Sequence, residues 1–174
     1  MKRLIFALIL ATAIFTAFAR PVFSQTDICA ASSAVLKNSC VKEDTRVEIL
    51  KNFLKRYNSP LVPYTQEFVD AADSYGVDWR LVPAITGVES TFGKQIPAGS
   101  FNAYGWNNGD FKFTSWEDSI WYVTSQLRVR YLDRGATTIP QIGRIYAPPS
   151  PFWAGKVTLF MAKIQTLSNF TLDL

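Results

Sequence analysis

One carboxylate in this chain ends an apolar helical pattern. In the segment 79–90, WRLVPAITGVES, residues Val82, Ile85 and Glu89 are related by steps of three and seven positions, which puts them on one side of a helix. We therefore expect Glu89 to lie at the flank of the apolar stripe, partly removed from water. Desolvation raises the pKa of a carboxyl group. A carboxylic acid that keeps its proton near neutral pH can act as the general acid in breaking a glycosidic bond.

The loop after this helix is rich in aromatic rings and asparagine, as in SFNAYGWNNGD at 100–110. Aromatic faces pack against the C–H faces of sugar rings, and amide groups bind hydroxyl and acetamido groups. Phe92, Phe101 and Trp106 could form an apolar wall beside Glu89. The alternative interpretation assigns these residues a purely structural role. Glu89 would then lie at the edge of the core and reach solvent or hold the following loop, and the aromatic rings would belong to the core.

A mechanism with two carboxylates needs a second acid about 5–10 Å from the first. Asp110 is the best candidate, although Asn-Gly-Asp is also good turn chemistry. Glu117 and Asp118 fit the first turn of the next helix better. If no second carboxylate faces Glu89, the acetamido group of the substrate could be the nucleophile, or Glu89 could act as both acid and base in a lytic transglycosylase.

Composition excludes several other classes of site. The chain has no histidine and two cysteines in 174 residues. It therefore cannot build a Ser-His-Asp triad, a Cys-His thiol protease, a His-ligated zinc or a four-thiolate metal site. We expect no metal and no cofactor. The sequence has no stripe of lysine and arginine residues, so we expect no nucleic-acid partner.

The N-terminus is typical of an export signal. Residues 1–19 have a basic start and a charge-free apolar run, and Ala17-Phe18-Ala19 fits a cleavage site. An uncleaved membrane anchor is the alternative. Residues 20–40 are interpreted as a linker with a cysteine pair, and an oxidising compartment would favour a Cys29–Cys40 bridge. The sequence thus predicts an exported protein in the periplasm, the cell wall or the medium.

Helical periodicity and cap residues organise the rest of the chain, 41–174, into one domain. We expect a mainly α fold of about six helices with short loops. Start signals stand at Asp78, Ser115 and Thr138, and Gly76 is a stop signal. Aromatic residues around Asn-Gly at 104–113 predict a small β-hairpin.

Two short motifs in this order resemble the active-site segment of bacterial β-N-acetylglucosaminidase domains of the lysozyme-like superfamily. That group includes peptidoglycan autolysins and mannosyl-glycoprotein endo-β-N-acetylglucosaminidase domains. The motifs are Glu89-Ser90-Thr91-Phe92-Gly93 and Asn102-Ala103-Tyr104-Gly105. WEDSIWYVTSQL at 116–127 and IGRIYAPPSPFWAGKV at 142–157 resemble later segments of such domains, so the likeness covers about residues 60–165.

The resemblance implies a lysozyme-like α-rich fold, with a cleft between the helices and the hairpin. It implies hydrolysis of β-1,4 bonds at N-acetylglucosamine in peptidoglycan or another glycan, by a protein that we expect to be monomeric. Glu89 would be the general acid, and Tyr146 would orient the substrate or stabilise the transition state. The candidate sugar contacts are Ser90, Phe101, Asn102, Tyr104 and Trp106. A glycan-binding module without catalysis remains an alternative.

Overall fold

A computed structural model of the chain describes residues 44–148 and 150–171, without the side chains of 168–171. The predicted signal segment 1–19, the linker 20–40 and both cysteines, Cys29 and Cys40, lie outside the described residues. The part that is described belongs to one unit, Cys40–Leu174. Within it, no helix combines the length and the apolar character that a membrane span requires.

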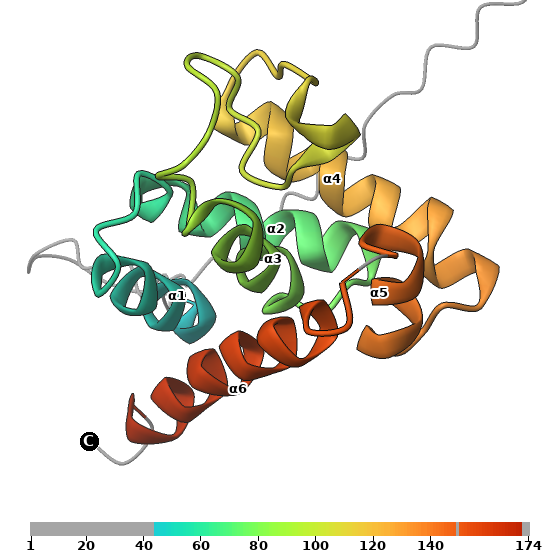
Figure 1. The fold of residues 1–174 in the computed structure, drawn as a ribbon. Coiled ribbons are helices and arrows are strands. Elements are labelled where there is room, and N and C mark those ends of the chain that lie inside the picture. Colours follow the sequence, from blue (N-terminus) through green and yellow to red (C-terminus); the bar gives the residue numbers. More distant parts are fainter. Residues whose placement is uncertain (1–43, 149, 172–174) are drawn as a thin grey trace, which may run out of the picture. The chain divides into compact units, whose positions relative to one another are not determined.

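The predicted mainly α fold is confirmed (Figure 1). The described residues form α1 (Thr45–Lys55), α2 (Thr65–Tyr75), α3 (Leu81–Ser90), α4 (Trp116–Arg130), α5 (Ile139–Tyr146) and α6 (Trp153–Thr171). Three short 3₁₀ helices join them: η1 (Val62–Tyr64), η2 (Trp106–Gly109) and η3 (Leu132–Arg134).

Local hydrogen bonds explain where several helices begin and end. Ser115 accepts the Asp118 N–H at the start of α4, and Thr138 forms a capping box with Gln141 at the start of α5. Gly76 ends α2 in the left-handed conformation. These three signals agree with the sequence. Asp78 does not cap α3 itself, because its carboxylate accepts the N–H of Arg80 in the turn before Leu81.

The predicted hairpin is wrong, since the described residues contain no β-strand. The turn at 106–109 is the 3₁₀ helix η2, in which Asn107 and Asn108 have φ of 51° and 55°. The chain before the turn and the chain after it are joined through the Asn102 side chain. Its amide nitrogen donates to the carbonyl of Trp106 and to the carbonyl of Phe111. A side chain therefore supplies the cross-links that strand pairing would have supplied.

Helix α3 runs through the middle of the described unit, packed mainly on α6 and also in contact with α4 (Figure 1). Its buried face includes Leu81, Val82 and Ile85. Close packing explains why residue 87 is a glycine, because a Cβ there would lie 2.6 Å from the Phe92 ring. Close contact with this ring and with Phe160 of α6 fixes the end of the helix, and with it the position of residue 89.

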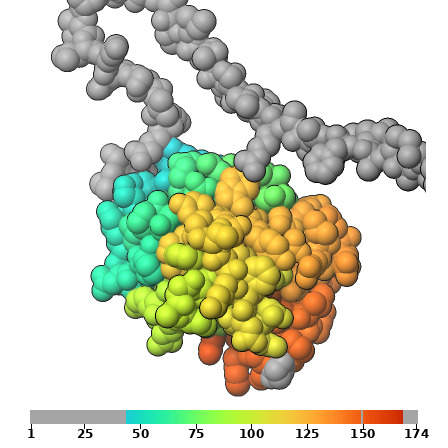
Figure 2. All heavy atoms as spheres, turned by 90° about the horizontal axis from the view of Figure 1, so that it is seen from above, coloured from blue at the N-terminus to red at the C-terminus, as the bar shows by residue number. Residues whose placement is uncertain are grey.

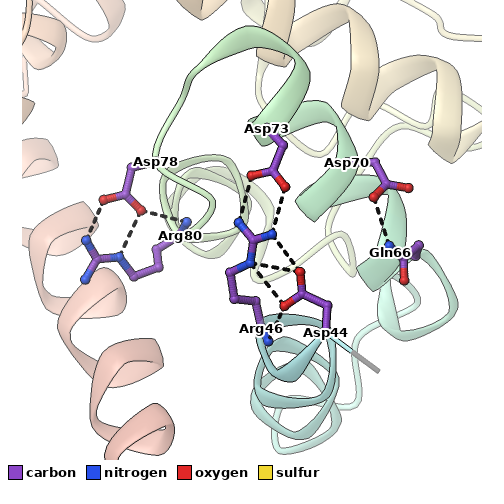
Figure 3. Close-up of polar contacts among 7 residues, drawn as sticks. All are labelled: Asp44, Arg46, Gln66, Asp70, Asp73, Asp78 and Arg80. Atoms are coloured by element: carbon purple, nitrogen blue, oxygen red, sulfur yellow. Dashed lines mark hydrogen bonds and ion pairs between the residues drawn. The ribbon is translucent and has the colours of Figure 1, made fainter. Parts of the chain in front are cut away.

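An arginine bridge holds α1 against α2 (Figure 3). Arg46 contacts Asp44 at 2.6 Å and Asp73 at 2.7 Å. Its hydrogen bond to Asp44 lowers the pKa of that carboxyl. Helices α1 and α6 also pack together, so α1 connects α2 to α6.

Candidate active site

Glu89 lies half-buried in the last turn of α3. The partial negative charge at a helix C-terminus disfavours a carboxylate there. Burial raises the pKa of Glu89 above its ordinary value, although a hydrogen bond from Trp153 acts in the opposite direction. The half-buried position and the raised pKa agree with the sequence prediction.

Trp153, at the start of α6, is the partner of this carboxyl group. Its indole N–H donates to Oε1 of Glu89 at 2.6 Å, and the ring itself is buried. Oε2 receives no hydrogen bond within the described residues, yet it is not among the fully buried atoms that lack a partner. Oε2 therefore reaches the surface of the molecule and is the oxygen available to carry a proton.

Gly105 lies directly against Oε2. A Cβ at this position would be 2.9 Å from that oxygen, and the residue has a φ of 63°. Any side chain would therefore strain the backbone and press on the carboxyl group. Glycine here leaves one oxygen of Glu89 uncovered.

Tyr146 stands beside the same carboxyl group. Its hydroxyl donates to the backbone carbonyl of Tyr104 at 2.6 Å, and its ring stacks on Trp153 with centroids 5.0 Å apart. The pKa of Tyr146 is raised well above its ordinary value, first by burial and then by the charge of Glu89. Its hydroxyl thus stays protonated and joins α5 to the loop at Tyr104.

A groove of about 330 Å³ adjoins these residues. Gly105 and Tyr146 line it, and Trp106 forms another part of its wall. Asn107, Asn108, Arg130 and Tyr131 complete the lining. Glu89 is not itself a lining residue, but it lies against Gly105 and beside Tyr146 at the groove. Figure 2 looks onto the face where the loop 93–115, yellow-green to yellow, lies next to α4.

Asn102 holds this loop from inside and is not free to bind a sugar. Its Oδ1 accepts the N–H of Trp106 at 2.9 Å and that of Tyr104 at 3.4 Å. With the two bonds donated by Nδ2, all four of its hydrogen-bonding positions are occupied. The predicted sugar contact is instead the residue that positions Trp106.

Three further sugar-contact candidates are also placed in the interior or away from the groove. The Tyr104 side chain is fully buried, and only its carbonyl reaches Tyr146. Ser90 is buried, with Oγ 2.8 Å from the Ala103 carbonyl, and it accepts the Gly93 N–H. Phe101 packs edge-on against Trp116. Of the predicted set, Trp106 alone lines the groove.

Of the predicted apolar wall, Trp106 lines the groove, whereas Phe92 and Phe101 do not. Phe92 is buried against Phe53 and Phe160, on the core side of α3. Trp153 and Tyr146 surround the carboxyl group instead. Phe92 follows Thr91 in the left-handed conformation, which turns the chain sharply after α3 and sends this ring inward.

The structure does not support Asp110 as the second acid. It is exposed at the end of η2 and is not a lining residue of the groove. None of the described residues that line the groove is an aspartate or a glutamate. Burial alone raises the pKa of Glu89, against the lowering effect of the Trp153 hydrogen bond. Glu89 is therefore the acid that the described residues place against this groove.

Sequence reasoning missed Trp153 and Arg130 as site residues. A buried tryptophan needs an acceptor for its N–H, but the acceptor is 64 positions away in the chain. Arg130 fits the basic end of α4, where it complements the helix dipole. Nothing in the sequence places it across from Trp106.

Among the residues that the structure describes, no three acidic or thiol side chains are grouped closely enough to hold a metal ion. No protein-family model matches the chain, and no curated protein matches it either.

Proposed function

We propose that this protein cleaves β-1,4 bonds at N-acetylglucosamine in the glycan strands of peptidoglycan, with Glu89 as the general acid. The observation that carries the proposal is the environment of one oxygen. Oε1 of Glu89 is held by Trp153, while Oε2 has no donor within the described residues, reaches the surface and lies against Gly105 at a groove. Trp106 and Tyr146 give that groove the aromatic lining that sugar rings bind.

In the first step, the proton on Oε2 passes to the oxygen between two sugars as the bond from that oxygen to C1 breaks. Because none of the described residues lining the groove is an aspartate or a glutamate, the developing charge at C1 must be met by another group. The oxygen of the substrate's own acetamido group is suited to this, since it can bond to C1 and form an oxazolinium ring.

In the second step, the Glu89 carboxylate takes a proton from the attacking group. Attack by water at C1 opens the ring and completes hydrolysis. If the bond that breaks is instead the one at C1 of muramic acid, attack by the C6 hydroxyl of that sugar gives a 1,6-anhydro-muramic end, the product of a lytic transglycosylase. The single carboxylate favours this second candidate as much as substrate-assisted hydrolysis.

The test is cell-wall clearing by the wild type, Glu89→Gln and Glu67→Gln. Glu67 is a matched control because its Oε2 accepts the indole N–H of Trp121, also at 2.6 Å, away from the groove. We expect Glu89→Gln to lower the rate by about 10²-fold or more and Glu67→Gln to clear walls normally. A wild type that binds walls without clearing them would instead identify a glycan-binding module.

A further inference from the structure

Arg130 lines the groove beside Trp106, which belongs to the loop held by Asn102. It is the last residue of α4 and is exposed. Its guanidinium carbon lies 5.9 Å from the centre of the Trp106 ring. The ring holds the charged group over one side of the groove, because the face of an indole attracts a cation.

Several other arginines of the described residues have carboxylate partners. Arg46 binds Asp44 and Asp73, and Arg80 binds Asp78 (Figure 3). Arg128, on the same helix as Arg130, pairs with Asp133 at 2.8 Å. Arg130 itself forms no ion pair with a carboxylate of the described residues. Its charge is thus available to a ligand.

A guanidinium group presents its N–H donors in a planar fork that fits a carboxylate. We propose that Arg130 binds a carboxylate of the substrate, so that the groove selects an acidic amino-sugar strand over a neutral one such as chitin. The inference rests on the proposed function, because it assigns a substrate class to the same groove. In peptidoglycan the carboxylate has two possible sources, the lactyl group of a sugar without its peptide and the acidic groups of a peptide stem.

The test compares kcat/KM on three substrates: chitin oligosaccharides, glycan strands stripped of peptide, and strands that carry peptide stems. We expect Arg130→Gln to lose about tenfold more on a carboxylate-bearing strand than on chitin oligosaccharides. Arg130→Lys keeps the charge without the fork and should lose less. Arg144→Gln removes an exposed arginine outside the groove and is the control.

The substrate on which Arg130 matters identifies the source of the carboxylate, and either source supports the inference. Raising the salt concentration should reduce the wild-type preference, because an exposed charge is screened. An equal loss on neutral and acidic substrates, or no loss on either, would overturn it.

Binding measurements separate this inference from the proposed function. Calorimetric titration of the Glu89→Gln protein, with and without Arg130→Gln, follows the same oligosaccharides without cleavage. If the wild type cleaves nothing but the acidic strand binds through Arg130, the proposed function fails and the inference stands. If Arg130→Gln leaves this affinity unchanged, the inference fails whatever the activity.

Discussion

Trp153 donates its indole N–H to Oε1 of Glu89 at 2.6 Å, and so connects the start of α6 to the end of α3. Trp121 and Glu67 make the same bond at the same distance elsewhere in the molecule. The two pairs differ in their helix positions. Glu67 is in the first turn of α2, where the helix dipole favours a negative charge, whereas Glu89 is in the last turn of α3, where it does not. The same indole–carboxylate hydrogen bond is therefore found once where the helix dipole favours the carboxylate and once where it favours the protonated acid.

Trp153→Phe keeps an aromatic ring near Tyr146 and removes the N–H. Because that hydrogen bond lowers the pKa of Glu89, its loss should raise the pKa further and move the alkaline limb of the kcat/KM profile to higher pH. We expect a stability loss of about 1–3 kcal/mol, from the lost bond. Trp121→Phe should cost a similar amount in denaturant unfolding and leave the limb in place. A limb that moves to lower pH in Trp153→Phe contradicts this assignment.

Gly105→Ala should damage the site beyond the strain of its backbone. Gly99 is a matched control in the same loop, with a φ of 65° and no atom within 4 Å of an added Cβ. Each alanine should cost about 1–2 kcal/mol for its left-handed conformation. Only Gly105→Ala places a methyl group 2.9 Å from Oε2 of Glu89, so we expect it alone to lower kcat strongly. Unfolding curves and kinetics on both variants decide the matter, and equal kcat values would show that Oε2 is not the reacting oxygen.

Asn102→Asp tests the internal role of the residue. The substitution keeps the shape but removes the Nδ2 donor that binds the carbonyls of Trp106 and Phe111. A carboxylate oxygen would then face two carbonyl oxygens, at a cost of about 2–4 kcal/mol. We expect a lower melting temperature at pH 7 and partial recovery in acid, where the introduced carboxyl group is protonated and can donate once. If Asn102 bound sugar directly, affinity would fall with stability unchanged.

Glu89→Gln should make the folded protein relatively more stable as pH rises. The folded state holds the Glu89 proton more tightly than the unfolded state, because burial raises its pKa. Wild-type stability from this group is complete below the unfolded pKa and falls as pH rises through the folded one. Glutamine has no such dependence. The difference in free energy of unfolding, variant minus wild type, should therefore grow in urea titrations as pH rises above the ordinary pKa of a glutamic acid, and level off above the folded pKa of Glu89. A difference that stays constant would mean that the pKa of Glu89 is not raised.

Local signals in the sequence were sufficient for the start of α4, the start of α5 and the end of α2. Ser115, Thr138 and Gly76 act on neighbours within four residues, and the apolar spacing of Val82 and Ile85 placed Glu89 at the edge of the core. Each depends on contacts that a short stretch of sequence contains.

The partners of Glu89 could not be found in this way. Trp153 is 64 residues away, and periodicity cannot tell which acceptor its N–H meets. Asn102 was expected to bind sugar because its amide can do so, but the same amide can replace strand pairing inside a loop. The hairpin prediction failed for this reason, since an Asn-Gly turn with aromatic flanks does not reveal a third residue that cross-links both arms.

The most direct measurement is mass spectrometry of purified peptidoglycan digested in ¹⁸O-labelled water by the wild type and by Glu89→Gln. The proposal predicts soluble fragments with new reducing N-acetylglucosamine ends that carry one ¹⁸O, formed by the wild type and not by the variant. Anhydro ends without ¹⁸O, also dependent on Glu89, would select the lytic transglycosylase. The absence of new ends with the wild type, or equal amounts from both proteins, would contradict the role of Glu89 in cleaving glycan.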